Sequence, residues 1–425
     1  MTLGKHAALT PGEAKDLQLR AGSVFRPRTP ITTRDLFAGR WNQLTIVADA
    51  VNQTGLHVAI YGERGVGKTS LANVIEPVIS VFDEDRVTQN SAPRMVIKTN
   101  ANSGDTFSSI WLKLFDEITW EERAAGLDPS PTHRSLVLAF NLPETITIDD
   151  VRRVLTRLPG AVFIIDEFDR SASATAREFT DLIKALSDFS VDCTVILVGV
   201  AETIDTLIAD HASITRTLVQ VQLKRMLANE LKEILDKAES TLDITFSNEG
   251  KSLIVNISQG LPHYTHLLGL HSVRLAAGRL RDHVERNDVF GALKECVSQA
   301  EQTVTEKHSK ATHSAHKDAL YKHVLLACAL TAANSHDALG YFNPGSITGP
   351  LSAILRRSVE IATFNSHLSD FCQAKRGNVL ERIGQPRAYR FRFTNPLMVP
   401  FIFMDAVMNG IIGDKELSKQ LAGKF

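Results

Sequence analysis

The sequence predicts an α/β fold, in which a doubly wound parallel-sheet domain is followed by a helical lid and a C-terminal winged-helix domain. Apolar runs at 57–61, 94–99, 161–166, 193–199 and 217–223 have the nearly continuous aliphatic character of strands that are covered on both faces. The segments between them carry apolar residues at i, i+3, i+4 and i+7, which is typical of helices packed on a sheet. This alternation of strand and helix indicates a doubly wound domain.

Beyond residue 226 the strand pattern stops and the spacing of apolar residues becomes helical. Residues 306–318 are polar and lack large apolar side chains, so they form either a linker or an exposed helix end. Three short helical segments and two extended runs around the turn 384–387 then outline a winged helix-turn-helix. The predicted divisions are an N-terminal arm 1–33, a nucleotide-binding domain 34–225, a helical lid 226–305, a linker 306–318 and a winged helix 319–425.

The composition is typical of a globular protein and does not indicate what the protein binds. The chain has 425 residues, of which 44% are hydrophobic, and 47 Lys and Arg nearly balance 48 Asp and Glu. The net charge of -1 therefore neither favours nor excludes nucleic acid. The four cysteines form no C-x-x-C pair, and no signal-like or 18-residue apolar segment is present. We expect a reduced, cytoplasmic protein without a membrane span.

The segment 62–70 has the pattern of a phosphate-binding loop, Gly-x-x-x-x-Gly-Lys-Thr. Its glycines allow a tight turn that aims backbone N–H groups at phosphate oxygens, and the following helix directs the positive end of its dipole there. Lys68 is expected to neutralise the β- and γ-phosphates, while the Thr69 hydroxyl reaches Mg²⁺. The predicted nucleotide-binding residues of the loop are Gly62, Glu63, Arg64, Gly65, Val66, Gly67, Lys68, Thr69 and Ser70.

An acidic pair follows the strand at 161–166. A carboxylate at the carboxyl end of a strand near the phosphate loop can hold the water shell of a metal ion, which suits Asp166. A second carboxylate one residue later can polarise the attacking water, and Glu167 is predicted to be this general base. The alternative is a solvated acidic turn after a core strand. Hydrolysis, with ATP and Mg²⁺ as the bound species, is the expected activity.

These motifs together resemble those of the AAA+ ATPases. No Asn-Lys-x-Asp or Leu-Ser-Gly-Gly-Gln segment supports a GTPase or an ABC transporter. The sequence is most similar to the origin-recognition initiator clade and its bacterial relatives, near the transposition-regulator and STAND-type ATPases. The segment 34–40 resembles the part of that family that closes over adenine, which implies roles for Leu36, Phe37 and Arg40; the alternative is an ordinary helix-start turn.

The resemblance implies further residues and reveals departures. Arg216, or less favourably Arg225, matches the arginine finger that enters a neighbouring subunit's site, which implies an oligomer. Glu202 or Thr203 stands where the family has a polar γ-phosphate sensor, but an ionised glutamate cannot donate a hydrogen bond. In the helical lid, members of the family commonly have an arginine that contacts the γ-phosphate, and this sequence has His263 in that place. His263 could contact phosphate only when protonated, or it could merely cap a lid helix.

The separation between Lys68 and Asp166 is longer than is usual in this family, and residues 120–146 resemble an insertion. The insertion is either a docking element or a tolerated surface loop.

The C-terminal module leaves the partner open. Residues 320–425 hold 12 Lys and Arg against 7 Asp and Glu. The basic residues of interest are Arg356, Arg357, Lys375, Arg376, Arg382, Arg387, Arg390 and Arg392. One hypothesis is a DNA-associated ATPase that contacts duplex through 344–393, with hydrolysis remodelling the assembly. The other is a signalling or defence-type switch whose module recruits a protein partner.

Overall fold

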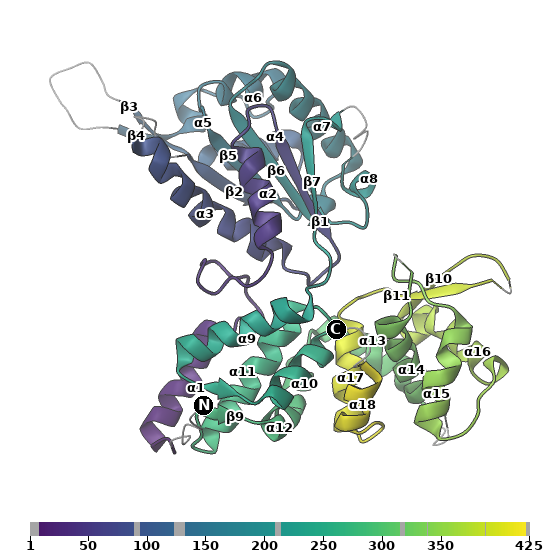
Figure 1. Cartoon of the computed structure of the whole chain (residues 1–425). Coiled ribbons are helices and arrows are strands. Elements are labelled where there is room, and N and C mark those ends of the chain that lie inside the picture. The colour runs from purple at the N-terminus through teal and green to yellow at the C-terminus, as the bar shows by residue number, and fades with distance from the viewer. Residues whose placement is uncertain are drawn as a thin grey trace. The chain divides into compact units, whose positions relative to one another are not determined.

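The computed structural model describes residues 8–88, 94–122, 132–208, 214–314, 319–337, 339–386 and 388–421. The chain divides into two compact units (Figure 1). One unit, the α/β unit, comprises Pro30–Glu63 and Gly67–Lys224. The other, the helical unit, comprises Met1–Thr29, Arg64–Val66 and Arg225–Phe425. Each unit is described by itself.

The α/β unit is built on a five-stranded sheet in the order β2-β5-β6-β1-β7. Its strands are β1 (His57–Gly62), β2 (Val96–Asn100), β5 (Ala161–Asp166), β6 (Cys193–Val200) and β7 (Leu218–Gln222). Every neighbouring pair in this sheet is parallel, so all carboxyl ends meet at one edge. The predicted parallel α/β sheet is confirmed, and each strand lies within two residues of its expected position.

Helices cover both faces of this sheet, as Figure 1 shows. One layer holds α2 (Trp41–Val51) and α3 (Lys68–Thr88), and the other holds α4 (Phe107–Asp116), α6 (Ile148–Leu155) and α7 (Ser173–Asp188), while α8 (Ile204–Leu207) follows β6. An aromatic cluster lies between the second layer and the sheet, with the rings of Trp111 and Phe163 5.3 Å apart and those of Trp111 and Phe179 6.0 Å apart. These fully buried rings anchor the strand that ends in the acidic pair.

The predicted insertion has secondary structure of its own. Strand β3 (Thr119–Glu122) pairs antiparallel with β4 (Thr132–Ser135), and the short helix α5 (Leu136–Ala139) follows. Residues 123–131 lie outside the described part of the chain.

The helical unit begins with a helix from the far N-terminus. Helix α1 (Pro11–Val24) packs against α9 (Ala228–Leu242) and α11 (Pro262–Gly278), and its buried face includes Leu17. A capping box at Thr10 and Glu13 begins this helix. The predicted arm 1–33 therefore contains a docked helix, because the amphipathic pattern of 11–24 finds its partner more than 200 residues away. The lid continues with α10 (Asn248–Ser258) and α12 (Arg286–Ser298), and two-residue strands β8 (Thr245–Phe246) and β9 (His283–Val284) pair in parallel.

The polar segment 306–318, predicted as a linker or an exposed helix end, is largely helical over its described residues 306–314. Helix α13 (Gln302–Thr312) includes most of it, and its buried residues Val304, His308 and Ala311 face the unit. Within the predicted segment, the buried face of this helix consists of small or polar side chains. A search for large apolar residues therefore does not detect it. Residues 315–318 lie outside the described residues.

Three helices and a hairpin follow, as the sequence indicated. The helices are α14 (Tyr321–Asn334), α15 (Thr348–Leu355) and α16 (Ile361–Phe371), and the antiparallel strands are β10 (Leu380–Ile383) and β11 (Arg390–Phe393). Phe342 forms a further bridge with Phe391. Helices α17 (Met398–Met408) and α18 (Asp414–Leu421) end the described chain. Across the described ranges, no helix combines the length and the apolar character needed to cross a bilayer.

Candidate nucleotide site

The loop between β1 and α3 has the backbone that its glycines require. Gly67 has φ 95°, a conformation that side-chain-bearing residues rarely adopt. A Cβ on Gly62 would lie 2.2 Å from the carbonyl oxygen of Leu223, so only glycine allows this close approach of the loop to the chain after β7. These constraints hold the loop at the carboxyl edge of the sheet.

Lys68 lies buried at the start of α3, where its Nζ donates to the carbonyl oxygens of Gly62 (3.0 Å) and Glu63 (2.8 Å). The ammonium is thus held by carbonyl oxygens of its own loop, and its contact with phosphates remains a prediction. Ser70 Oγ accepts a hydrogen bond from the Ile31 backbone N–H (3.1 Å), which ties the first turn of α3 to the segment before α2. Thr69 lies beside it and is partly exposed.

The remaining loop residues, Arg64, Gly65 and Val66, group with the helical unit, where Arg64 pairs with Glu301 at 2.9 Å. Val66 is buried and Arg64 is exposed. Their predicted nucleotide contacts remain predictions.

Asp166 ends β5 and is only 3% exposed. Both of its carboxylate oxygens have partners: Oδ1 accepts from the Glu167 backbone N–H (2.9 Å), and Oδ2 lies 2.9 Å from the Lys98 ammonium. Lys98 comes from β2 and donates a second hydrogen bond to Asn73 Oδ1 in α3 (2.7 Å). Neither Lys98 nor Asn73 belongs to a motif that the sequence reveals. The available signal was a lysine directly after the apolar residues Val96 and Ile97 of this strand.

Glu167 adopts the left-handed conformation, with φ 55°. This conformation is uncommon for a residue with a side chain and costs on the order of 1 kcal/mol. Its carboxylate, which is 45% exposed, pairs with Arg170 at 2.9 Å. The sharp turn directs the chain out of β5 immediately after Asp166, so the two consecutive carboxylates occupy different surroundings: one is buried and one is accessible to water.

Asp169 links this acidic turn to the neighbouring strand. Its Oδ1 accepts a hydrogen bond from the Val200 backbone N–H at the end of β6 (2.7 Å). A Cβ on Gly199 would lie 3.0 Å from the backbone N and from Oδ1 of Asp169, so glycine allows the close contact. The acidic turn is thus fixed to the strand end that precedes Glu202 and Thr203, both of which are exposed. The sensor role of these two residues remains a prediction.

The donor set at this edge fits a magnesium ion. Carboxylate and hydroxyl oxygens are ligands that Mg²⁺ prefers. Asp166 ends β5, and Thr69 lies in the first turn of α3, after the loop that follows the carboxyl end of β1 in the same parallel sheet. Asp166 would hold the ion through its water shell, with Thr69 on the phosphate side. Among the residues described, no cluster of three or more His, Cys, Asp or Glu offers a separate metal site.

The residues predicted to contact adenine lie before α2. Phe37 is buried and packs edge-to-face on Trp41, with ring centroids 5.9 Å apart, while Leu36 is partly exposed. Arg40 is also buried, has φ 62°, and donates to the Lys224 carbonyl oxygen. Arg40 thus connects the segment before α2 to Lys224, the last residue of the α/β unit. The turn is strongly constrained, and its contact with adenine remains a prediction.

Arg216 lies in the turn immediately before β7 and is exposed. Because β7 is parallel to β1, its amino end lies at the sheet edge opposite the phosphate loop, about 15 Å away by the rise of a five-residue strand. The predicted role of Arg216 as a finger in another copy remains a prediction. Arg225 instead donates to the Gln259 carbonyl oxygen (3.3 Å).

His263 lies at the start of α11, where its Nδ1 is 2.6 Å from the Pro27 carbonyl oxygen. Burial lowers the pKa of His263, although the hydrogen bond to this carbonyl acts in the opposite direction. The predicted phosphate contact needs the protonated ring, and this environment favours the neutral one. The other reading, a histidine that fixes the beginning of a lid helix, agrees better with the structure.

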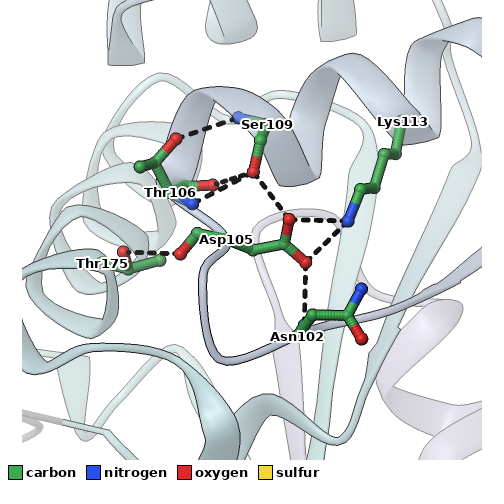
Figure 2. A network of polar contacts seen from close by, with 6 residues as sticks. All are labelled: Asn102, Asp105, Thr106, Ser109, Lys113 and Thr175. Atoms are coloured by element: carbon green, nitrogen blue, oxygen red, sulfur yellow. Dashed lines mark hydrogen bonds and ion pairs between the residues drawn. The ribbon is translucent and has the colours of Figure 1, made fainter.

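The loop between β2 and α4 is held by the network in Figure 2. The Asp105 carboxylate accepts hydrogen bonds from the Lys113 ammonium (2.6 Å to each oxygen), the Asn102 backbone N–H (2.7 Å) and the Ser109 hydroxyl (2.9 Å). Its backbone carbonyl accepts from the Thr175 hydroxyl in α7 (3.5 Å). Burial raises the pKa of Asp105, but these hydrogen bonds outweigh it, so the pKa is lower than usual.

The basic residues of the C-terminal module are largely engaged with neighbours. Arg390 pairs with Asp337 (2.6 Å) and Arg392 with Glu381 (2.6 Å). Arg376 and Arg382 lie over the rings of Tyr321 and Tyr389, at 3.7 and 4.6 Å. Lys375 lies 3.5 Å from Asp370. Arg356 and Arg357, after α15, are both exposed, and Arg387 lies outside the described residues.

The fold and this site define a P-loop ATPase. Residues 51–207 match the model of a family described as an AAA domain. This segment contains the phosphate loop, the acidic pair and four of the five strands, so the predicted AAA+ ATPase class is confirmed for it. A comparison with curated protein sequences gives no match.

Several solved structures are similar along most of the chain. The ORC2 protein of Aeropyrum pernix is 15% identical, with a TM-score of 0.47, over 94% of this chain and 98% of that one. The Walker-type ATPase PABY2304 of Pyrococcus abyssi is 15% identical, with a TM-score of 0.48, over 89% and 99%. The Aeropyrum pernix ORC1 protein, solved in complex with DNA, is 15% identical, with a TM-score of 0.45, over 92% and 97%.

Proposed function

We propose that this protein is an ATP-hydrolysing AAA+ ATPase that works as an oligomer on DNA or on DNA-bound assemblies. The observation that carries the ATPase part is the edge of the sheet at which the Lys68 loop and the Asp166–Glu167 pair meet. Asp166 is buried and has partners at both oxygens, whereas Glu167 is partly exposed on a left-handed turn. This difference separates a metal-holding role from a proton-accepting role.

In the proposed reaction, a water molecule attacks the γ-phosphorus and passes its proton to the Glu167 carboxylate. The bond between the γ-phosphorus and the bridging oxygen breaks, leaving ADP and inorganic phosphate. Lys68 moves from its loop carbonyls to the β- and γ-phosphates and stabilises charge there. Mg²⁺, when bound, supplies further positive charge to the phosphate oxygens. Asp166 and Thr69 would hold it, and Arg216 of another copy would stabilise the charge that develops on the transferred phosphoryl group.

The C-terminal helices and hairpin would bind duplex DNA as a winged helix. Arg356 and Arg357 lie between α15 and α16, where the second and third helices of such a module face the nucleic acid. Both are exposed, and the local charge is positive. Lys375 and Arg376, near a pocket on the same module, would add contacts to phosphates.

A DNA-binding measurement at two salt concentrations, with ATP and with ADP, tests this part. Phosphate contacts release counterions, so affinity should fall steeply with salt. We expect the double substitution R356A/R357A to weaken binding and reduce the salt slope by about 2. The matched control K415A/K419A removes two exposed lysines from α18 and should change neither. Salt-insensitive binding, or equal losses in both variants, would reject the DNA role.

A second candidate is a switch that recruits a protein partner through this module. It is favoured by the pairing of the hairpin arginines with Asp337 and Glu381, which reduces the positive field that DNA would meet. It is also favoured by His263, which contacts the Pro27 carbonyl oxygen and occupies the position at which initiators have a phosphate-binding arginine. This candidate would be supported if the chain bound a protein partner in an ATP-dependent manner and did not bind DNA with either ATP or ADP.

A further inference from the structure

The environment of Asp166 differs from that of a simple metal-binding carboxylate because a lysine is built into it. Lys98 lies in the middle of β2, which pairs with β5 so that Asn100 is opposite Asp166. Lys98 is two residues before Asn100 and therefore shares its face of the sheet. Its long side chain reaches diagonally along the neighbouring strand, placing the ammonium 2.9 Å from Asp166 Oδ2.

The position of the ammonium is fixed from a second side. Asn73 Oδ1 accepts a hydrogen bond from Lys98 (2.7 Å), and Asn73 Nδ2 donates to the Ile31 carbonyl oxygen (3.3 Å). The amide therefore has a defined orientation, with its oxygen toward the lysine. Asn73 follows Lys68 by five residues in α3, so this contact connects the acidic strand end with the helix that carries the phosphate loop.

The pair is also shielded from solvent. The Asp166 side chain is 4% exposed and the Lys98 side chain is 25% exposed. Water screens such a pair weakly, so the ammonium neutralises much of the carboxylate's charge. A divalent cation that approached Asp166 would meet this positive charge close by. The phosphates of a nucleotide would bring the negative charge needed to offset it.

We propose that Lys98 is a positioning residue that makes metal binding at Asp166 depend on the nucleotide. By neutralising Asp166, it keeps the affinity of the nucleotide-free protein for divalent cations low, so that the ion enters together with the phosphates. This inference rests on the proposed metal role of Asp166 and adds a control on when the metal binds.

The test measures Mn²⁺ binding to the full chain without nucleotide, from the paramagnetic resonance signal of free Mn²⁺. Lys98→Gln removes the charge and keeps an N–H donor, while Lys98→Arg retains the charge and serves as the matched control. We expect wild type and K98R to bind weakly and K98Q to bind at least tenfold more tightly. The gain should disappear in K98Q/D166N. Equal Mn²⁺ binding by wild type and K98Q would overturn the inference.

A second measurement separates this inference from the proposed function. Binding of a fluorescent ATP analogue is titrated with Mg²⁺ in wild type, K98Q and D166N. We expect the Mg²⁺ midpoint to fall in K98Q and to rise in D166N. A raised midpoint in D166N with no change in K98Q would leave the metal role standing and reject the lysine's control. An unchanged midpoint in D166N would reject the metal role itself.

If K98Q does not fold, N73A provides the same test with all charges kept. Loss of the Asn73 anchor should loosen Lys98 and tighten Mn²⁺ binding by a smaller factor than K98Q. An unchanged affinity in a folded N73A protein would contradict the proposed fixing of the ammonium.

Discussion

At the scale of single residues, the site depends on how two adjacent carboxylates are separated. Asp166 is the last residue of a buried strand, and Glu167 begins a left-handed turn that brings it to solvent. The pattern of a buried apolar strand followed by two acids was enough to predict both positions. The Lys98 pairing was not predictable in the same way, because it depends on which strand lies next to β5 and in what register.

Glu167→Gln tests the assignment of the general base. The amide preserves the size of the side chain but cannot accept a proton from water, so we expect turnover to fall at least about a hundredfold. ATP binding, followed by a fluorescent analogue, should stay within about twofold of wild type. Glu178→Gln, which changes an exposed acid on α7, is the control and should hydrolyse ATP normally. Undiminished turnover in E167Q would remove Glu167 from this role.

At the scale of elements, the predictions were most accurate where the apolar periodicity was strong. The strands of the sheet and the helices α4, α7, α9 and α14 follow directly from it. Less was predictable for two helices. The partners of α1 lie far along the chain, and the buried face of α13 consists mostly of small or polar side chains. Helix α1 is amphipathic, but nothing local indicates that it packs on α9 and α11, because docking depends on surfaces formed much later in the chain.

The docking of α1 can be measured by a pair of leucine substitutions. Leu17 is 6% exposed, whereas Leu19, on the opposite face, is 71% exposed. We expect L17A to lower the free energy of unfolding of the helical unit by about 2–3 kcal/mol through lost burial and the cavity left behind. L19A should change it by less than about 0.5 kcal/mol. Equal effects, followed by denaturant unfolding, would show that α1 is not docked as described.

The Asp105 network predicts a dependence of stability on pH. The pKa of Asp105 is lowered in the folded state from a usual value of 3.8, so the ionised form favours folding. This contribution is complete above the unfolded-state pKa and is lost as the pH falls through the lower folded-state pKa. We expect D105N to cost about 1–2 kcal/mol at pH 7 and progressively less below pH 4. A cost that does not change with pH would contradict the ionic role of this carboxylate.

At the scale of the whole molecule, the proposed ATPase has a site that a second copy completes. Arg216 lies at the amino edge of the sheet, opposite the phosphate loop. The family resemblance suggested the finger, and the parallel sheet supplies an independent geometric reason why it would act on another subunit. The partner of the C-terminal module was not predictable from charge alone, because several of its arginines pair with acids within the module.

Mixing two inactive variants tests the shared site most directly. E167Q lacks the base but keeps its finger, and R216A lacks the finger but keeps its base. We expect each to hydrolyse ATP at least tenfold more slowly than wild type, and an equimolar mixture to recover a substantial part of wild-type turnover. In mixed oligomers, an intact base from an R216A copy meets an intact Arg216 from an E167Q copy. Full activity of R216A alone, or no recovery on mixing, would contradict a site shared between subunits.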